Sequence, residues 1–124
     1  MEVIEQPSKR DVFVMQHRQG RVRIFLDARR PGVVVPPHLA RERALILEYG
    51  EDMPIPIHDM SVDDDGVRAT LSFFQEPHRT FIPWSAVYLV MGDEGKGVCF
   101  HDDVPADVDV TEFGRHRFDP AAVN

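Results

Sequence analysis

The sequence lacks several features that mark secreted or membrane-bound proteins. Its single cysteine, Cys99, cannot form an internal disulfide, and its apolar neighbours predict an inert buried thiol. The longest apolar runs, such as 86–91, are far shorter than the roughly 20 residues that cross a bilayer. Residues 1–10 include acidic side chains and no apolar signal-peptide core. We therefore expect a cytoplasmic protein that has no membrane partner.

The 21 acidic residues outnumber the 14 lysines and arginines. The formal net charge is −7, so the overall field repels the phosphates of a nucleic acid. We therefore predict no nucleic-acid partner. One local exception is a set of arginines that forms either a solvated strand face or a small patch for an anion or a partner: Arg18, Arg21, Arg23, Arg29 and Arg30.

The sequence contains no motif typical of catalysis or metal binding. The histidines occur singly, without the close partners that zinc sites use, and there is no cysteine pair. No serine lies in a Gly-x-Ser-x-Gly elbow, and the glycine-rich stretch at 92–97 lacks the Lys-Ser/Thr ending of a phosphate-binding loop. We predict a protein that is not an enzyme, with no catalytic residue, no metal and no cofactor.

Length and composition indicate one folded domain. A chain of 124 residues, of which 43% are hydrophobic, can bury one core but not two. Residues 1–7 are polar and end in a proline, which predicts a disordered lead-in. We place the single domain at 8–101. Residues 102–124 are acidic and then mixed, with isolated apolar side chains, which predicts a flexible tail.

A short helix is expected at the start of the domain. Ser8 followed by Asp11 resembles a capping box, and Gly20 suits a helix end, so the helix is predicted over 8–19. A helix of this length is marginal in water by itself. Because its apolar side chains exceed a single contact line, we expect some of them to meet a second subunit. The predicted dimer interface comprises Val12, Phe13 and Met15.

The remaining residues of the domain read as short antiparallel strands. Alternating apolar residues predict a strand at 21–26, and another is expected at 44–49. Asp65-Gly66 predicts a hairpin turn between 60–62 and 67–74, because this pair supplies the positive φ of tight turns. Further strands are expected at 79–82, 87–91 and 97–100, with one helical turn at 83–86. This pattern favours a mainly β fold, a small and partly open barrel with one N-terminal helix.

Several motifs in order resemble the stringent starvation protein B (SspB) family, whose members are adaptors that deliver tagged substrates to the ClpXP protease. The matching pieces span 8–101 and include Phe25-Leu26-Asp27, 31–36, Leu45-Ile46-Leu47, 67–73, Ile82-Pro83-x-x-Ala86-Val87 and 93–100. The resemblance implies an open SH3-like or Sm-like barrel and a homodimer formed through the N-terminal helix. It also implies a groove for an extended ssrA-like degradation-tag peptide, and ClpX as a partner.

The resemblance places the peptide groove on the strands of the barrel. By position and apolar character, its residues are Leu47, Tyr49, Leu71, Phe73, Phe74 and Tyr88, although each could equally be ordinary barrel core. The family commonly has Arg-Phe-Gly-Gly where this chain has 72–75, and a small amide where it has Glu48. A carboxylate at that position would disfavour acidic tags. The alternative function is a ligand-sensing or structural protein-interaction barrel that kept the fold but lost tag binding.

Overall fold

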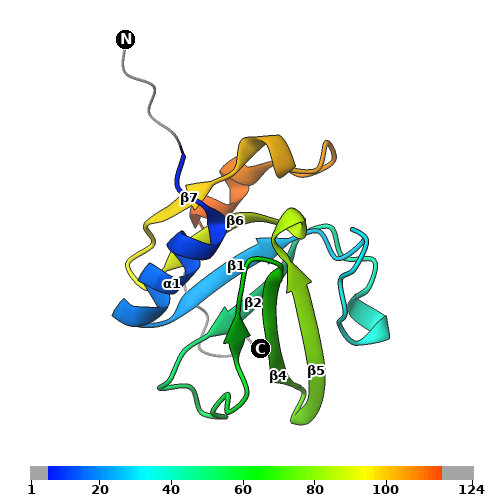
Figure 1. The fold of residues 1–124 in the computed structure, drawn as a ribbon. Helices are drawn as coiled ribbons and strands as arrows, with labels where there is room; N and C mark the ends of the chain where they lie inside the picture. Colours follow the sequence, from blue (N-terminus) through cyan, green and yellow to red (C-terminus); the bar gives the residue numbers. More distant parts are fainter. Residues whose placement is uncertain (1–5, 116–124) are drawn as a thin grey trace.

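Two antiparallel sheets and one helix make up the fold (Figure 1). The computed structural model describes residues 6–115. Strand order is β2-β1-β6-β7 in the first sheet and β3-β4-β5 in the second. The elements are α1 (Lys9–Gln19), β1 (Val22–Leu26), β2 (Leu45–Tyr49), β3 (Ser61–Val62), β4 (Gly66–Phe73), β5 (Glu76–Pro83), β6 (Val87–Gly92) and β7 (Gly97–Cys99). The sheets do not close into a barrel, so the expected mainly β, open architecture is confirmed.

Four short 3-10 turns join or follow these elements, at Pro37–Leu39, Trp84–Ala86, His101–Asp103 and Val110–Arg115. The single helical turn expected over 83–86 is present at Trp84–Ala86, and Pro83 caps it instead of being its first residue. In the part of the chain described here, no helix combines the length and apolarity needed to span a membrane.

Local capping and tertiary packing together explain α1. The Ser8 hydroxyl accepts a hydrogen bond from the backbone N–H of Asp11 at 3.1 Å, which satisfies one of the free donors of the first turn. Phe13 is fully buried, and its ring meets those of Tyr49 and Trp84 edge-on at 5.2 and 5.8 Å between centroids. The helix therefore gains stability from packing on its own sheet.

This packing changes the expected dimer interface. Val12 and Phe13 are 1% and 0% exposed within their own chain, so neither side chain is available to a second subunit. Met15 is 51% exposed and remains free for such a contact. The sequence pattern shows that these residues are apolar, but it does not show which of them are buried against the sheets of their own chain.

The first sheet is buried on both faces. Val22, Ile24 and Leu26 of β1 face the main core, which lies between the two sheets and α1. On the other face, Phe25 joins a second apolar cluster with Tyr88, Leu89 and Phe113. The Phe25 and Phe113 rings lie 4.7 Å apart. The burial of every residue of β1 follows from this two-sided covering.

A flexible tail was predicted over 102–124, and the second cluster corrects this prediction for the described part, 102–115. Phe113 is only 8% exposed, and the residues between His101 and Phe113 add Val104, Val108 and Val110 to the apolar contacts. Isolated apolar residues therefore cover a sheet face here instead of marking a loose segment. Residues 116–124, like most of the expected lead-in at 1–7, lie outside the described range.

Two hairpins build the second sheet. The expected turn between β3 and β4 is present, but neither Asp65 nor Gly66 has the positive φ on which the prediction rested. The Asp63 carboxylate holds the turn instead, because it accepts the backbone N–H groups of Asp65 and Gly66 at 2.8 and 3.1 Å. The next turn was not expected at its actual position. Phe74 and Gln75, with φ of 51° and 69°, connect Phe73 directly to Glu76, so β5 begins before the predicted start at residue 79.

Two buried tyrosines provide a matched test of the core. The Tyr88 hydroxyl donates to the carbonyl of Arg43 at 2.9 Å, whereas the fully buried Tyr49 hydroxyl has no hydrogen-bond partner among the described residues. Burial raises the pKa of Tyr49. An unpaired buried hydroxyl is costly, so Tyr49→Phe should raise the free energy of unfolding by about 1 kcal/mol and Tyr88→Phe should lower it by about 1 kcal/mol.

Urea denaturation followed by circular dichroism measures both values. A loss of stability in Tyr49→Phe as large as that in Tyr88→Phe would contradict this account of the core.

Candidate functional site

The structure separates the six predicted groove residues into two groups. Five are buried, at 7% exposure or less, and only Phe74 is accessible, at 73%. The buried residues of β2 and β4 belong to the main core, and Tyr88 belongs to the second cluster: Leu47, Tyr49, Leu71, Phe73 and Tyr88. Alternation along a strand identifies inward-facing residues, but the inside of this small domain is packed core rather than an open groove.

Phe74 lies at the end of the β4–β5 hairpin in a strained conformation. A two-residue hairpin turn with positive φ at both positions normally contains Asn-Gly or Gly-Gly, because other residues meet a steric penalty there. The exposed Phe74 ring lies 6.2 Å from the His38 ring, between centroids, and so it does not fill a trough between the sheets.

Glu48 does not line the expected trough. Its neighbours Leu47 and Tyr49 face the main core, so alternation directs Glu48 to the opposite face of the first sheet. Its carboxylate accepts a hydrogen bond from the Arg21 guanidinium at 3.1 Å, and the side chain is largely buried. The expected repulsion of acidic tags by this carboxylate therefore has no structural basis.

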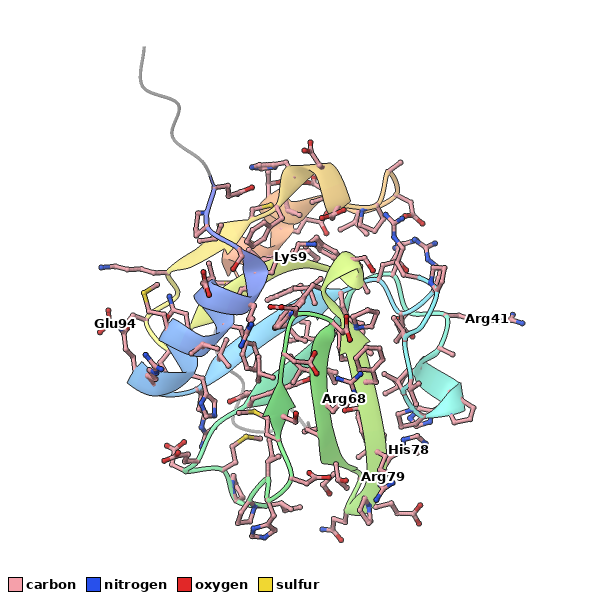
Figure 2. The ribbon with its side chains drawn as sticks, in the orientation of Figure 1. Lys9, Arg41, Arg68, His78, Arg79 and Glu94 are labelled. Carbon is pink, nitrogen blue, oxygen red and sulfur yellow. The ribbon has the colours of Figure 1, made fainter. Side chains whose placement is uncertain are left out.

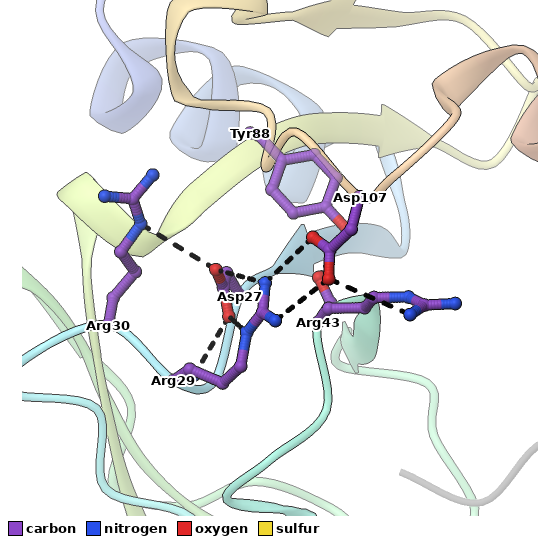
Figure 3. Close-up of polar contacts among 6 residues, drawn as sticks. All are labelled: Asp27, Arg29, Arg30, Arg43, Tyr88 and Asp107. Atoms are coloured by element: carbon purple, nitrogen blue, oxygen red, sulfur yellow. Dashed lines mark hydrogen bonds and ion pairs between the residues drawn. The ribbon is translucent and has the colours of Figure 1, made fainter.

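Three arginines of the run, Arg21, Arg29 and Arg30, form ion pairs with different carboxylates instead of one shared patch. Arg21 contacts both Glu48 and Asp52, and Arg23 is buried beside the same part of β2. Arg29 bridges two carboxylates (Figure 3). These contacts tie loops to the sheet, which is a structural role.

The Arg29 network joins the end of β1 to the C-terminal part of the chain. The backbone N–H, Nε and Nη2 of Arg29 donate to the Asp27 carboxylate at 3.0, 2.8 and 3.1 Å (Figure 3). Its Nη1 and Nη2 also donate to the two carboxylate oxygens of Asp107, at 3.0 and 3.1 Å. This fork geometry holds the segment that covers the second cluster.

The same contacts shift the pKa of each partner. Burial alone would raise the pKa of Asp27, but the hydrogen bonds from the side chain and backbone of Arg29 outweigh it and hold this pKa below its usual range. The side-chain hydrogen bond from Arg29 lowers the pKa of Asp107. Both carboxyl groups are therefore ionised at neutral pH.

The features described so far define a small, mainly β domain of the open-barrel class, with a helix packed on its first sheet. The chain belongs to the stringent starvation protein B (SspB) family, because the family model matches residues 12–119, which is most of the chain. A comparison with curated proteins finds no match. The family match confirms the resemblance and extends beyond residue 101, in agreement with the packing of the following residues on the first sheet.

Proposed function

We propose that this protein is a non-enzymatic adaptor that binds ssrA-like degradation tags and delivers their carriers to the ClpXP protease in the cytoplasm. The observation that carries the proposal is the family match over residues 12–119. An open β domain also suits the task, since an extended peptide can gain main-chain hydrogen bonds at a strand edge and side-chain contacts beside it.

We propose that the tag contacts the end of the β4–β5 hairpin. Phe74 is the accessible member of the predicted groove, and His38 lies beside it. A bulky residue at positive φ costs free energy, and such strain is concentrated at functional sites. An exposed aromatic ring held in this way supplies a large apolar contact for a peptide side chain.

Fluorescence anisotropy with a labelled ssrA-type peptide tests the proposal. The unmodified protein should bind the peptide saturably, at tens of micromolar or tighter. The double substitution Phe74→Asn with Gln75→Gly should weaken binding about tenfold and raise the free energy of unfolding by about 1–2 kcal/mol, because it removes the ring and relieves the turn. Glu94→Asn, in the exposed turn between β6 and β7, is the matched control and should change neither value.

A second candidate function is supported by the burial of the other five groove residues. On this alternative, the chain is a protein-interaction barrel that kept the adaptor fold without a tag groove. Absence of saturable binding by the unmodified protein would favour this function. Unchanged affinity in the double variant would show that the tag does not contact the hairpin end.

We also propose a homodimer through the exposed side of α1, where Met15 lies, and a contact with ClpX. A two-fold contact is the commonest way for a small domain to cover one apolar patch. Met15 is the one predicted interface residue that its own chain leaves exposed. A contact of the C-terminal segment 116–124 with ClpX would lie outside the described residues.

A further inference from the structure

The outer face of the second sheet, directed away from the main core, contains a hollow of 280 Å³. Side chains alternate along β4 and β5, so that residues such as Leu71 and Ile82 enter the core while Arg68 and Phe81 lie opposite each other on the outer face. The hollow is lined by Val34, Asp59, Arg68, Ala69, Arg79, Thr80 and Phe81. It is separate from the core positions predicted for the tag groove.

Two apolar walls of the hollow are held in place by neighbouring contacts. Val34 and Phe81 exchange backbone hydrogen bonds, at 2.9 Å from the Val34 N–H and 3.1 Å from the Phe81 N–H. The Arg68 guanidinium lies over the Phe81 ring at 4.3 Å. Val34 nevertheless remains 48% exposed. The hollow is therefore preformed, with an apolar surface available to a ligand.

The rim of the hollow has one strong positive charge without an ion-pair partner in the described range. The Asp59 carboxylate accepts the backbone N–H and the hydroxyl of Thr70, at 2.8 and 2.6 Å. These bonds are the main cause of its lowered pKa, and the nearby positive charge of Arg79 lowers it further. Arg68 pairs with Asp63 at 2.8 Å. Arg79 is exposed and makes no ion pair within residues 6–115. Asp59 is engaged by Thr70 and Asp63 by Arg68, so the exposed Arg79 guanidinium is the group of the hollow with which a ligand carboxylate can pair.

The edge of β5 offers a backbone donor beside this charge. Phe81 bonds Val34 through its outer backbone groups, so the N–H of Arg79, two residues away, faces the same edge. Beyond Val34 the chain turns into the Pro37–Leu39 segment, and no described residue accepts the Arg79 N–H. A short extended segment can therefore hydrogen-bond to β5 at this residue.

We propose that this outer hollow binds an extended segment of a partner protein that has an apolar side chain next to a carboxylate. The apolar side chain packs on the exposed Val34 side chain beside Phe81, and the carboxylate pairs with the Arg79 guanidinium. A backbone carbonyl of the segment accepts the Arg79 N–H. This site is additional to the proposed tag contact at Phe74, and its existence does not depend on that contact.

A titration of the ¹⁵N-labelled full chain, followed through backbone amide resonances, tests the proposal. The probe is an acetylated and amidated peptide, Gly-Ser-Leu-Asp-Ser-Gly, compared with versions that contain Leu-Lys or Ala-Asp at its centre. We expect saturable shifts at Val34, Arg79 and Phe81 with the first peptide, and affinity about tenfold lower for each of the others. Equal affinity for all three peptides would overturn the proposed chemistry.

Charge reversal at two exposed arginines distinguishes this site from a general charge effect. Figure 2 shows Arg79 on the β4–β5 hairpin and Arg41 projecting from another part of the molecule. Arg79→Glu should weaken binding of the Leu-Asp peptide about tenfold and improve binding of the Leu-Lys peptide, whereas Arg41→Glu should change neither.

Equal effects of the two substitutions would overturn the proposal. So would amide shifts confined to Phe74 and His38, because they would place the peptide at the proposed tag contact. The ssrA-type titration reports on Phe74 separately, so that failure of either proposal can be recognised without the other.

Discussion

Phe13→Ala is expected to lower the free energy of unfolding by about 3–5 kcal/mol, since it removes a fully buried ring from the centre of the main core. The ring contacts Tyr49 and Trp84, which belong to β2 and to the turn before β6. The cavity left by its removal would border three elements that are distant in sequence, and these elements cannot all collapse into it. Urea denaturation measures the loss, and a value below about 1 kcal/mol would contradict the packing of α1 described above.

Met15 provides the matched control on the same helix. Because it is 51% exposed, Met15→Ala should change the free energy of unfolding by no more than about 0.5 kcal/mol. Met15→Glu should also leave the fold intact but dissociate the proposed homodimer, as measured by sedimentation equilibrium at tens of micromolar protein. A dimer that persists in Met15→Glu would place the subunit contact elsewhere.

The second large effect is expected at Asp27, which is only 5% exposed and accepts three hydrogen bonds from Arg29. Asp27→Ala should lower the free energy of unfolding at neutral pH by about 2–3 kcal/mol, since hydrogen bonds to charged groups are among the stronger ones. The same substitution should loosen the residues around Asp107, because Arg29 would keep only one of its two carboxylate partners. Hydrogen exchange of the amides at 104–113 reports that loosening.

The lowered pKa of Asp27 also gives a sign to the pH dependence of stability. A carboxyl group whose pKa is lower in the folded protein stabilises the fold above its unfolded pKa, and this stability is lost as the pH falls through the folded pKa. Stability should therefore decrease below about pH 4, and the decrease should be smaller in Asp27→Ala. Asp107→Asn, at a more exposed partner of Arg29, should have a smaller effect than Asp27→Ala at neutral pH. An unchanged acid transition in Asp27→Ala would exclude this carboxyl group as its cause.

Local signals in the sequence were sufficient to predict several elements. The capping of α1 by Ser8 and the turn before β4 depend on residues close together in the chain, and both occur where they were expected. The turn is held by the Asp63 carboxylate, however, and not by a positive φ at Gly66. The alternation at Val22, Ile24 and Leu26 likewise identified the core-facing side of β1. Each of these features has a mechanism that acts over a few residues, so a single sequence contains enough information to predict it.

Other features depend on contacts that no local pattern encodes. The turn at Phe74 and Gln75 contains no glycine, so no local pattern predicted it. The two long strands that it joins impose a backbone conformation that its residues disfavour. The predicted groove residues were chosen by position and apolar character, and apolar strand residues of a closely packed domain are mostly covered by the rest of the chain. Phe113 is an isolated apolar residue without a periodic pattern around it. Its packing was therefore not predicted, although this one ring covers Phe25. The hollow beside Arg79 was missed because its walls come from segments far apart in the chain.

The free edge of β5 also bears on the solubility of a protein proposed to handle unfolded or tagged chains. On β5 the backbone nitrogens of Arg79 and Phe81 face away from β4, and by alternation so do those of residues 77 and 83. Both of these residues are prolines, so the strand keeps its bonds to β4 but lacks two outward donors. Val34 covers a third donor. A strand with a single outward N–H can accept one short visiting segment, but it cannot template the continuous intermolecular sheet from which amyloid-like aggregates grow.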